Sequence, residues 1–338
     1  MKELSFFDKT VYILNILLGI LLLLSNLAPY ISPKTFLPLS FLSLVVPFLF
    51  IINLPFIIYW FFKKKRNLIL SLSAVLLTYF TFGSFYRFGS SNQTPEHEDL
   101  SIMTYNCRDF EFAGRIKGKL TNHKIVDFIK EKNPDIVCFQ EFNRQAKKLL
   151  PEYTYHYITP YWSGKTVQTI LSKYPIIANG SLDFPETGNN AIYADIDYKG
   201  DTIRVYNLHF QSFNVIPSRV KSISRVVKSY DRMEKTFLKQ EEQADIFDQH
   251  RNNSPYRFII CGDLNNTAFS NVYHITKGAL QDTYDLKGSG FGKTFDLKIV
   301  PFRIDFILVD KTMDVITHEN FELKLSDHYP VLTSIRLR

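Results

Sequence analysis

Three long stretches without a charged residue lie near the N-terminus, at Thr10 to Pro33, Thr35 to Phe62 and Asn67 to Tyr86. Each is long enough to cross a hydrocarbon core of about 30 Å. A buried helix of a soluble protein or a cleaved signal peptide would also be apolar, but a signal peptide explains only the first stretch and lacks a basic n-region here. We therefore predict three transmembrane helices within residues 1–87, which makes the chain a multi-pass protein of the cell membrane in contact with the lipid bilayer.

The charges between these stretches predict an orientation. Lys63 to Arg66 form a basic cluster in the short loop between the second and third stretches. Such clusters stay in the cytoplasm, so the N-terminus is expected inside and the C-terminal domain on the extracytoplasmic side. The opposing interpretation relies on Arg87 alone as an inner anchor. Three prolines within the second stretch argue against a straight helix there.

The pattern changes at residue 88. Residues 88–99 are polar and acidic, as in a solvated linker. Beyond them, short apolar runs alternate with amphipathic ones, which predicts strands interspersed with helices in a domain over residues 100–338. Expected strands are 100–105, 135–140, 193–198, 202–209, 258–262, 303–309 and 330–336, and expected helices are 123–132 and 217–250. Lys199-Gly200-Asp201 predicts a hairpin turn.

Composition adds two constraints. The formal net charge is +7, but residues 1–95 hold eight Lys/Arg and two Asp/Glu, which leaves 32 basic and 31 acidic residues in 96–338. The bulk charge therefore reflects membrane topology and does not indicate a polyanion-binding domain. Cys107, Cys138 and Cys261 lie in apolar runs, as expected of small core residues and not of a disulfide framework or a metal site.

Polar side chains stand at the ends of apolar runs in six short motifs. In chain order these are Tyr105-Asn106, Gln140-Glu141, Asn207-Leu208-His209, Gly262-Asp263-Leu264-Asn265, Arg303-Ile304-Asp305 and Ser326-Asp327-His328. A polar side chain that ends a buried strand is rigidly held and still reaches solvent. The six motifs therefore predict one cleft lined by acids, amides and imidazoles.

These motifs carry a resemblance to a known family. The motifs lie in the segments SIMTYNCRDF, PDIVCFQEF, IRVYNLHFQS, FIICGDLNNT, FRIDFILV and SDHYPV. With these segments the chain resembles the endonuclease/exonuclease/phosphatase superfamily over about residues 99–338. One such motif is weak, whereas six in order are specific. The resemblance implies an α/β fold, a two-sheet α/β sandwich with outer helices, and a divalent-metal-dependent phosphoester hydrolase.

The resemblance also implies roles for individual residues. Glu141 would bind the metal, Mg²⁺ or alternatively Mn²⁺, because hard cations prefer carboxylate oxygens, and Asp327 would be a second metal contact. Asp263 would activate the attacking water and Asn265 would donate to a phosphoryl oxygen. The alternative interpretations are a surface carboxylate for Glu141, and a turn whose Asp263 and Asn265 side chains cap backbone amides.

The remaining site residues are the histidines and their partners. His328 would bind a phosphate oxygen or protonate the leaving group, oriented by Asp305, while His209 and Asn106 would contact phosphate and water. A single histidine in a strand is more often structural, and only the neighbouring motifs favour a catalytic role. Arg108 stands where some nucleases of the family have an acid, so a metal contact is missing or is replaced by a phosphate-binding guanidinium.

These observations predict a membrane-tethered phosphoester hydrolase that acts on nucleic acid or on a phospholipid headgroup. The rival hypothesis is a catalytically silent membrane-anchored binding protein that keeps the fold. Loss of Glu141, Asp263 or His328 would favour that rival, and all three are present.

Overall fold

A computed structural model describes residues 4–83, 85–89, 93–111, 121–213, 223–297 and 301–338. Six residues of the expected helix 217–250, at 217–222, lie outside this described part. The chain divides into two compact units, Met1–Phe85 with Thr267–His274, and Tyr86–Asn266 with Ile275–Arg338.

The first unit is built on three apolar helices, α1 (Phe6–Ser25), α2 (Pro33–Phe62) and α3 (Leu68–Phe82). All three expected apolar segments are therefore helical, and α2 changes direction at Phe36. Among the described residues, α1 and α2 are long and apolar enough to cross a membrane, whereas α3 has 15 residues and is shorter. Most of their surface is exposed within the unit, with only 22% of each apolar window buried.

A buried polar cluster joins the three helices. Asn15 on α1, Asn53 on α2 and Ser71 on α3 are fully buried. The Ser71 hydroxyl bonds to the side-chain oxygens of both asparagines, at 2.9 Å from Asn53 Oδ1. Hydrogen bonds between side chains of neighbouring helices help to hold apolar helices together when the hydrophobic effect does not drive their association.

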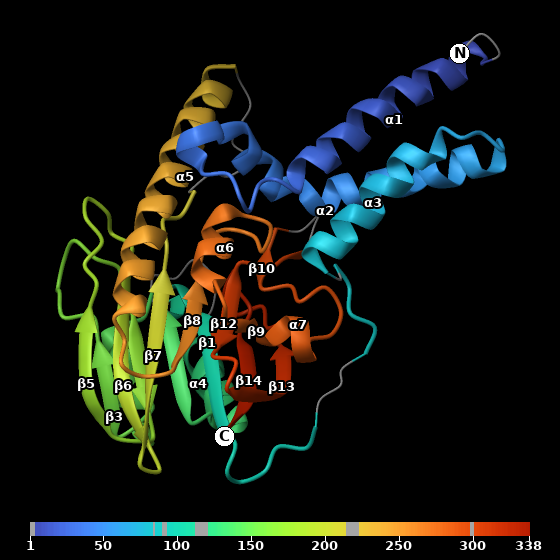
Figure 1. The fold of residues 1–338 in the computed structure, drawn as a ribbon. Coiled ribbons are helices and arrows are strands. Elements are labelled where there is room, and N and C mark those ends of the chain that lie inside the picture. The colour runs from blue at the N-terminus through green and yellow to red at the C-terminus, as the bar shows by residue number, and fades with distance from the viewer. Residues whose placement is uncertain (1–3, 84, 90–92, 112–120, 214–222, 298–300) are drawn as a thin grey trace. The chain divides into compact units, whose positions relative to one another are not determined.

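The second unit contains two six-stranded mixed sheets (Figure 1). The first has the order β13 (Met313–Asn320), β14 (Val331–Leu337), β1 (Leu100–Asn106), β2 (Ile136–Gln140), β4 (Thr169–Ser172) and β3 (Tyr155–Ile158). The second has the order β5 (Ile176–Ser181), β6 (Asn190–Tyr198), β7 (Asp201–His209), β8 (Phe258–Asp263), β12 (Asp305–Val309) and β9 (Gln281–Asp282). β10 (Phe295–Asp296) and β11 (Pro301–Phe302) pair separately.

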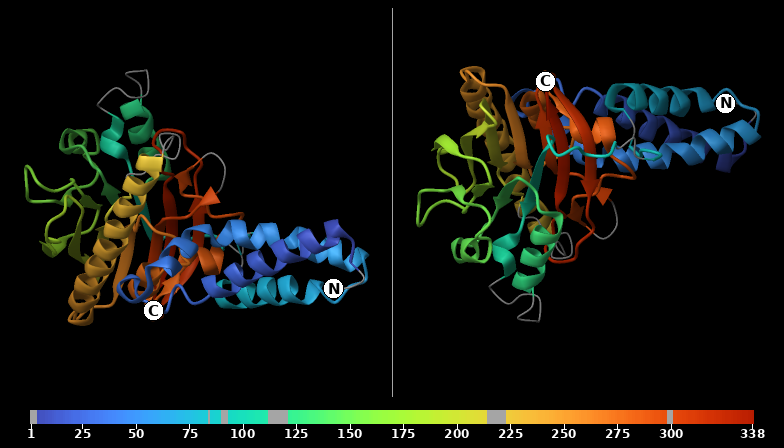
Figure 2. Two further views of the ribbon diagram at one scale, coloured as in Figure 1. Left: turned by 90° about the horizontal axis from the view of Figure 1, so that it is seen from above. Right: turned by 90° about the horizontal axis from the view of Figure 1, so that it is seen from below.

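Helices cover the outer faces of the two sheets (Figure 2). α4 (Thr121–Lys132) packs its buried Ile125 and Ile129 on the first sheet, and α5 (Ile223–Asn252) packs Phe247 on Tyr206 of the second. Short helices α6 (Asn271–Lys277) and α7 (Thr283–Lys287) follow β8 and β9. Aliphatic side chains from both sheets fill the space between them. The expected two-sheet α/β sandwich with outer helices is thus confirmed.

Strand register brings the polar motifs together. β1 and β2 are parallel with Asn106 opposite Gln140, and β7 and β8 are parallel with His209 opposite Asp263. β12 runs antiparallel to β8 with Asp305 opposite Asp263. Because parallel strands end at the same edge, the last residues of β1, β2, β7 and β8 meet at one end of the sandwich, and Asp305, the first residue of antiparallel β12, lies beside them.

The described part of the linker is exposed at residues 93–98 and is bonded to the second unit at several points. The Gln93 amide donates to the Ile316 carbonyl at 3.1 Å, and Arg336 pairs with Asp99 at 2.7 Å and with Glu96 at 3.0 Å. These bonds join Gln93 to β13 and the acidic residues of the linker to β14, where Arg336 offers a cation that the linker sequence alone does not reveal.

Candidate active site

Asp263 is the centre of the candidate site. Its side chain is fully buried at the end of β8 and accepts hydrogen bonds from the Asn265 amide at 2.7 Å, from Asn265 Nδ2 at 3.2 Å and from Asn106 Nδ2 at 3.1 Å. Burial raises the pKa of Asp263 to about 7, although the neighbouring His328 ring favours the carboxylate. Such a carboxyl exchanges protons near neutral pH, as a general base requires.

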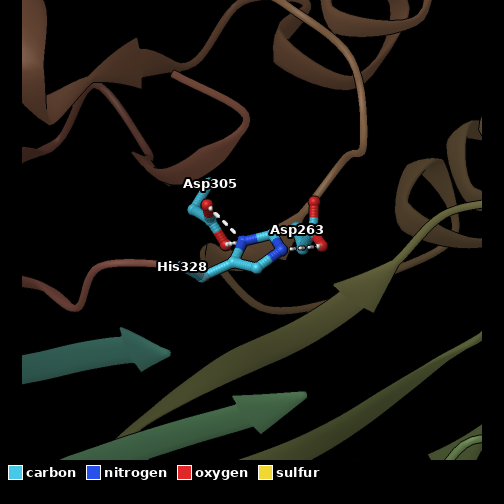
Figure 3. Close-up of side chains that lie close together, drawn as sticks. All are labelled: Asp263, Asp305 and His328. Atoms are coloured by element: carbon cyan, nitrogen blue, oxygen red, sulfur yellow. Dashed lines mark hydrogen bonds and ion pairs between the residues drawn. The ribbon is translucent and has the colours of Figure 1, made fainter. Parts of the chain in front are cut away.

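His328 lies between two carboxylates (Figure 3). Its Nδ1 is 3.0 Å from Asp305 Oδ2, and its Nε2 is 3.6 Å from Asp263 Oδ2. Burial disfavours the imidazolium, but the carboxylates of Asp305 and Asp263 outweigh it and raise the pKa of His328 to about 10. The ring is therefore a cation near neutral pH, with Nδ1 held by Asp305 and Nε2–H available to an anionic substrate.

Glu141 and His209 border Asp263 on its other side. Glu141 Oε1 lies 3.8 Å from His209 Nε2 and 3.5 Å from Asn106 Nδ2, and His209 Nε2 lies 3.8 Å from Asp263 Oδ2. The Glu141 side chain is 39% exposed, whereas the His209 ring is buried. Burial lowers the pKa of His209, so its ring is neutral at neutral pH.

Thr166 holds the His209 ring. Its hydroxyl oxygen lies 3.3 Å from His209 Nδ1, and the hydroxyl donates to the Gly188 carbonyl at 3.1 Å. The Nε2 atom of the ring faces the Glu141 and Asp263 carboxylates, each at 3.8 Å. This nitrogen can exchange a hydrogen bond with water in the site.

Asp327 occupies a different position from the other seven expected site residues. Its Oδ2 accepts from Arg108 Nη1 at 2.7 Å, and both side chains are about one-third exposed. The pair adjoins the site, because the Arg108 amide donates to Asn106 Oδ1 at 3.2 Å and the Ser326 hydroxyl donates to the Asn106 carbonyl at 2.9 Å. The structure thus groups Asn106, Glu141, His209, Asp263, Asn265, Asp305 and His328 in one chain of contacts and pairs Asp327 with arginine.

Two groups of side chains have atoms that could bind a divalent cation. Among the described residues, Asp263, Asp305 and His328 have ligand-type atoms within 4.8 Å of one another. However, an imidazolium held between two carboxylates has no free lone pair for a metal. Glu141 fits better, because its partly exposed oxygen has only long contacts, and Mg²⁺ binds through one or two carboxylates while keeping several waters.

The backbone is constrained where the strands end. Gly262 has φ +150°, and a Cβ there would collide with the Leu208 carbonyl oxygen on the neighbouring strand, so the Gly-Asp sequence lets β7 and β8 approach closely. Glu141 and Asn265 have φ values of 50° and 49°, which are uncommon for residues other than glycine. Strain of this kind occurs where the surrounding structure holds functional side chains in place.

Two positioning residues escaped the sequence analysis. Thr166 orients His209, and buried Thr294 accepts from the Ile304 and Asp305 amides at 2.9 and 3.0 Å. No spacing rule distinguishes these threonines from others.

Comparison with known proteins identifies two segments of the chain. Residues 103–328 match the model of the "Endonuclease/Exonuclease/phosphatase family", and residues 8–85 match a domain of unknown function. No curated protein matches the chain.

Several solved structures share the fold. The catalytic domain of human Nocturnin, with a bound sulfate anion, is 14% identical, with a TM-score of 0.54 over 75% of this chain and 97% of that one. An endonuclease/exonuclease/phosphatase from Bacteroides vulgatus is 20% identical, with a TM-score of 0.53 over 71% and 99%. D. rerio TDP2 complexed with a single-strand DNA product is 16% identical, with a TM-score of 0.51 over 70% and 99%. At these identities the likeness establishes the fold.

Proposed function

The chain belongs to the endonuclease/exonuclease/phosphatase family, and on that basis we propose that it is a divalent-metal-dependent phosphoester hydrolase tethered to a membrane. The observation that carries the proposal is the Asp305–His328–Asp263 array, in which a charged imidazole and a carboxyl that titrates near pH 7 stand beside the accessible Glu141 carboxylate. Phosphoester hydrolysis needs a base, a cation for the phosphoryl oxygens and help for the leaving oxygen.

Each group then has a definite task. Asp263 removes a proton from the attacking water, which the Asn106 and Asn265 amides and His209 Nε2 help to orient. His328 donates from Nε2 to a phosphoryl oxygen, and Asp305 holds the ring so that this donor faces the substrate. Solved relatives of the fold include a protein with a bound sulfate and one with a DNA product, which supports a site for oxyanions.

Glu141 would hold the divalent cation, Mg²⁺ or Mn²⁺. A cation held there would neutralise charge on the phosphoryl oxygens and would lower the pKa of a water bound to it. The Arg108–Asp327 pair lies at the edge of the site and contributes a guanidinium for a substrate phosphate. If a substrate phosphate takes the place of the carboxylate, Asp327 would be free to act as the second metal contact expected from the sequence.

We place the protein in the cell membrane as a multi-pass protein, with α1, α2 and the shorter α3 as its spans and the catalytic domain on the extracytoplasmic side. The exposed apolar surfaces of the helices and their shared polar cluster support spanning, and the basic residues Lys63 to Arg66 support the orientation. Nucleic acids and phospholipid headgroups are the candidate substrates.

A substrate screen tests the function. Full-length protein in detergent, with Mg²⁺ or Mn²⁺, would be incubated with DNA, RNA, sphingomyelin and phosphoinositides, and Asp263→Asn protein would serve as the control. Hydrolysis of at least one class by the wild type and not by the variant supports the proposal. Failure to turn over any phosphoester, with the metal bound, favours a catalytically silent binding protein.

A further inference from the structure

Three exposed aromatic side chains form a patch on the second unit. Tyr86, Phe88 and Phe291 are 40%, 94% and 48% exposed, and Tyr86 contacts the other two rings with centroid distances of 4.8 Å each. Clustered rings with this exposure are uncommon on a water-facing surface, whereas aromatic side chains are enriched at membrane–water interfaces. The half-buried Arg87 within this aromatic patch adds a cation that suits anionic headgroups.

Chain continuity limits how far this patch lies from the apolar helices. α3 ends at Phe82, and Tyr86 follows four residues later. Four residues span at most about 14 Å even when fully extended. With α3 in a bilayer, the patch therefore lies within reach of the headgroup region, whatever the orientation of the two units.

The patch is also attached to the loop that supports the active site. Arg87 and Gly290 exchange backbone hydrogen bonds of 2.9 and 3.0 Å, and the Tyr284 hydroxyl donates to the Gly290 carbonyl at 2.8 Å. Gly292 has φ +61°, and a Cβ there would collide with the Tyr284 ring, so the loop is closely packed on α7. These contacts hold Phe291 close to Arg87, in the segment of chain that follows α3.

The same loop continues into the catalytic array. Three residues after Phe291, Thr294 binds the Asp305 amide, and Phe295 forms a bridge with His328 and packs on its ring at 4.9 Å between centroids. Only three residues of chain therefore separate Phe291 in the patch from Phe295, a neighbour of the catalytic imidazole. A patch held at the membrane surface would place this side of the active site at the level of lipid headgroups.

We propose that Tyr86, Phe88 and Phe291 insert into the headgroup region and hold the active-site loop there, so that the substrate is a phosphoester headgroup of a lipid in the same membrane. This inference rests on the hydrolase activity and membrane tether proposed above. It selects lipid over nucleic acid, because an interfacial patch brings no advantage to hydrolysis of a polyanion in solution.

The first test measures where the patch lies. Phe88→Cys and Phe291→Cys would carry a nitroxide label in full-length protein in proteoliposomes, which is selective because Cys107, Cys138 and Cys261 are buried. Ile177→Cys, 56% exposed on the edge strand at the other end of the second sheet, is the aqueous control, and Leu76→Cys, 46% exposed near the middle of α3, is the hydrocarbon control. We expect labels at 88 and 291 to be more accessible to oxygen than to a water-soluble nickel relaxant. If the labels at 88 and 291 are as accessible to water as the label at 177, the patch does not lie in the headgroup region. A water-accessible label at 76 overturns the membrane tether itself.

The second test measures the consequence for catalysis. In proteoliposomes, Phe88→Ser/Phe291→Ser should hydrolyse lipid phosphoesters at least about tenfold more slowly, because losing two interfacial aromatic side chains weakens contact with the bilayer. Turnover of bis-p-nitrophenyl phosphate in solution should stay within about twofold, because neither ring touches the catalytic groups. Ile177→Ser should change neither rate, and Phe88→Trp/Phe291→Trp should restore lipid turnover.

The outcomes are distinguishable. Unchanged lipid turnover in the double serine variant, an equal loss on both substrates, or efficient hydrolysis of DNA or RNA with none of lipid overturns the inference. Wild-type protein that hydrolyses neither lipid nor the soluble diester overturns the proposed function instead.

Discussion

Replacing Asp305 with asparagine tests how the charge of Asp305 acts on His328. The amide keeps the shape of the side chain and can still accept from His328 Nδ1, but it removes the charge 3.0 Å from the ring. The backbone bonds from the Ile304 and Asp305 amides to Thr294 do not involve the side chain and remain. The substitution therefore changes the ionisation of His328 with little change in packing.

The geometry sets the magnitude. Asp305 is nearer to the ring than Asp263, at 3.0 against 3.6 Å, so the substitution removes the closer of the two carboxylates that raise the pKa of His328. A hydrogen bond to a charged group contributes about 1.5 to 3 kcal/mol. Loss of about 2.7 kcal/mol of this kind in the transition state lowers turnover about 100-fold.

Two measurements on Asp305→Asn test this reasoning. The rate constant kcat on a soluble phosphodiester should fall about 100-fold, while metal affinity by calorimetry should stay within about twofold, because no contact joins Asp305 to Glu141. Asp310→Asn, which changes a carboxylate just beyond the same strand that bonds only within a turn, is the matched control and should retain wild-type turnover. Undiminished kcat, or loss of metal binding, would refute the assigned role.

Three further predictions follow from other parts of the molecule. Asp263→Asn and His328→Ala should each lower turnover at least about 100-fold with an unchanged circular dichroism spectrum; wild-type rates in either variant contradict the mechanism. A reporter active only outside the cytoplasm, fused after Thr94, should be active, and replacing Lys63 to Arg66 with glutamine should weaken that preference; a silent reporter reverses the orientation. Burial lowers the pKa of His318 from 6.5 to about 4, so the unfolded chain takes up this proton at higher pH than the folded one. Stability should therefore be full above pH 6.5 and fall by about 3 kcal/mol as the pH drops to 4. Denaturant titrations of His318→Gln at several pH values should show a free energy of unfolding that lacks this decrease below pH 6.5. The same dependence of that free energy on pH as in the wild type would show that another group titrates.

Much of the fold was predictable because its signals are local. The hairpin at Lys199-Gly200 follows from turn chemistry, and both residues have positive φ in the structure. Buried strands such as 258–262 follow from apolar runs that end in polar residues, and β8 extends that strand by one residue to Asp263. Strands β3 and β5 carry partly exposed side chains without strict alternation, and the sequence analysis missed them.

The site was less completely predictable, because it depends on contacts between distant strands. The motif order identified Asp263, Asp305 and His328, but it did not reveal that Arg108, 219 residues before Asp327, pairs with that aspartate. Nor did it reveal the buried bridge between the sheets, in which Gln140 Nε2 donates to Asn207 Oδ1 at 2.8 Å. Both residues belong to motifs that suggested a cleft, and they instead bond to each other inside the core.

Metal dependence of phosphoester hydrolysis tests the central claim most directly. Full-length protein would be stripped with EDTA and assayed on bis-p-nitrophenyl phosphate during titration with Mg²⁺ or Mn²⁺, beside Glu141→Gln protein. We predict no turnover after stripping, full recovery in the wild type, and in Glu141→Gln a metal requirement raised at least about tenfold, because the variant lacks the carboxylate assigned to the cation. Hydrolysis that survives EDTA, or wild-type metal dependence in Glu141→Gln, would contradict the account.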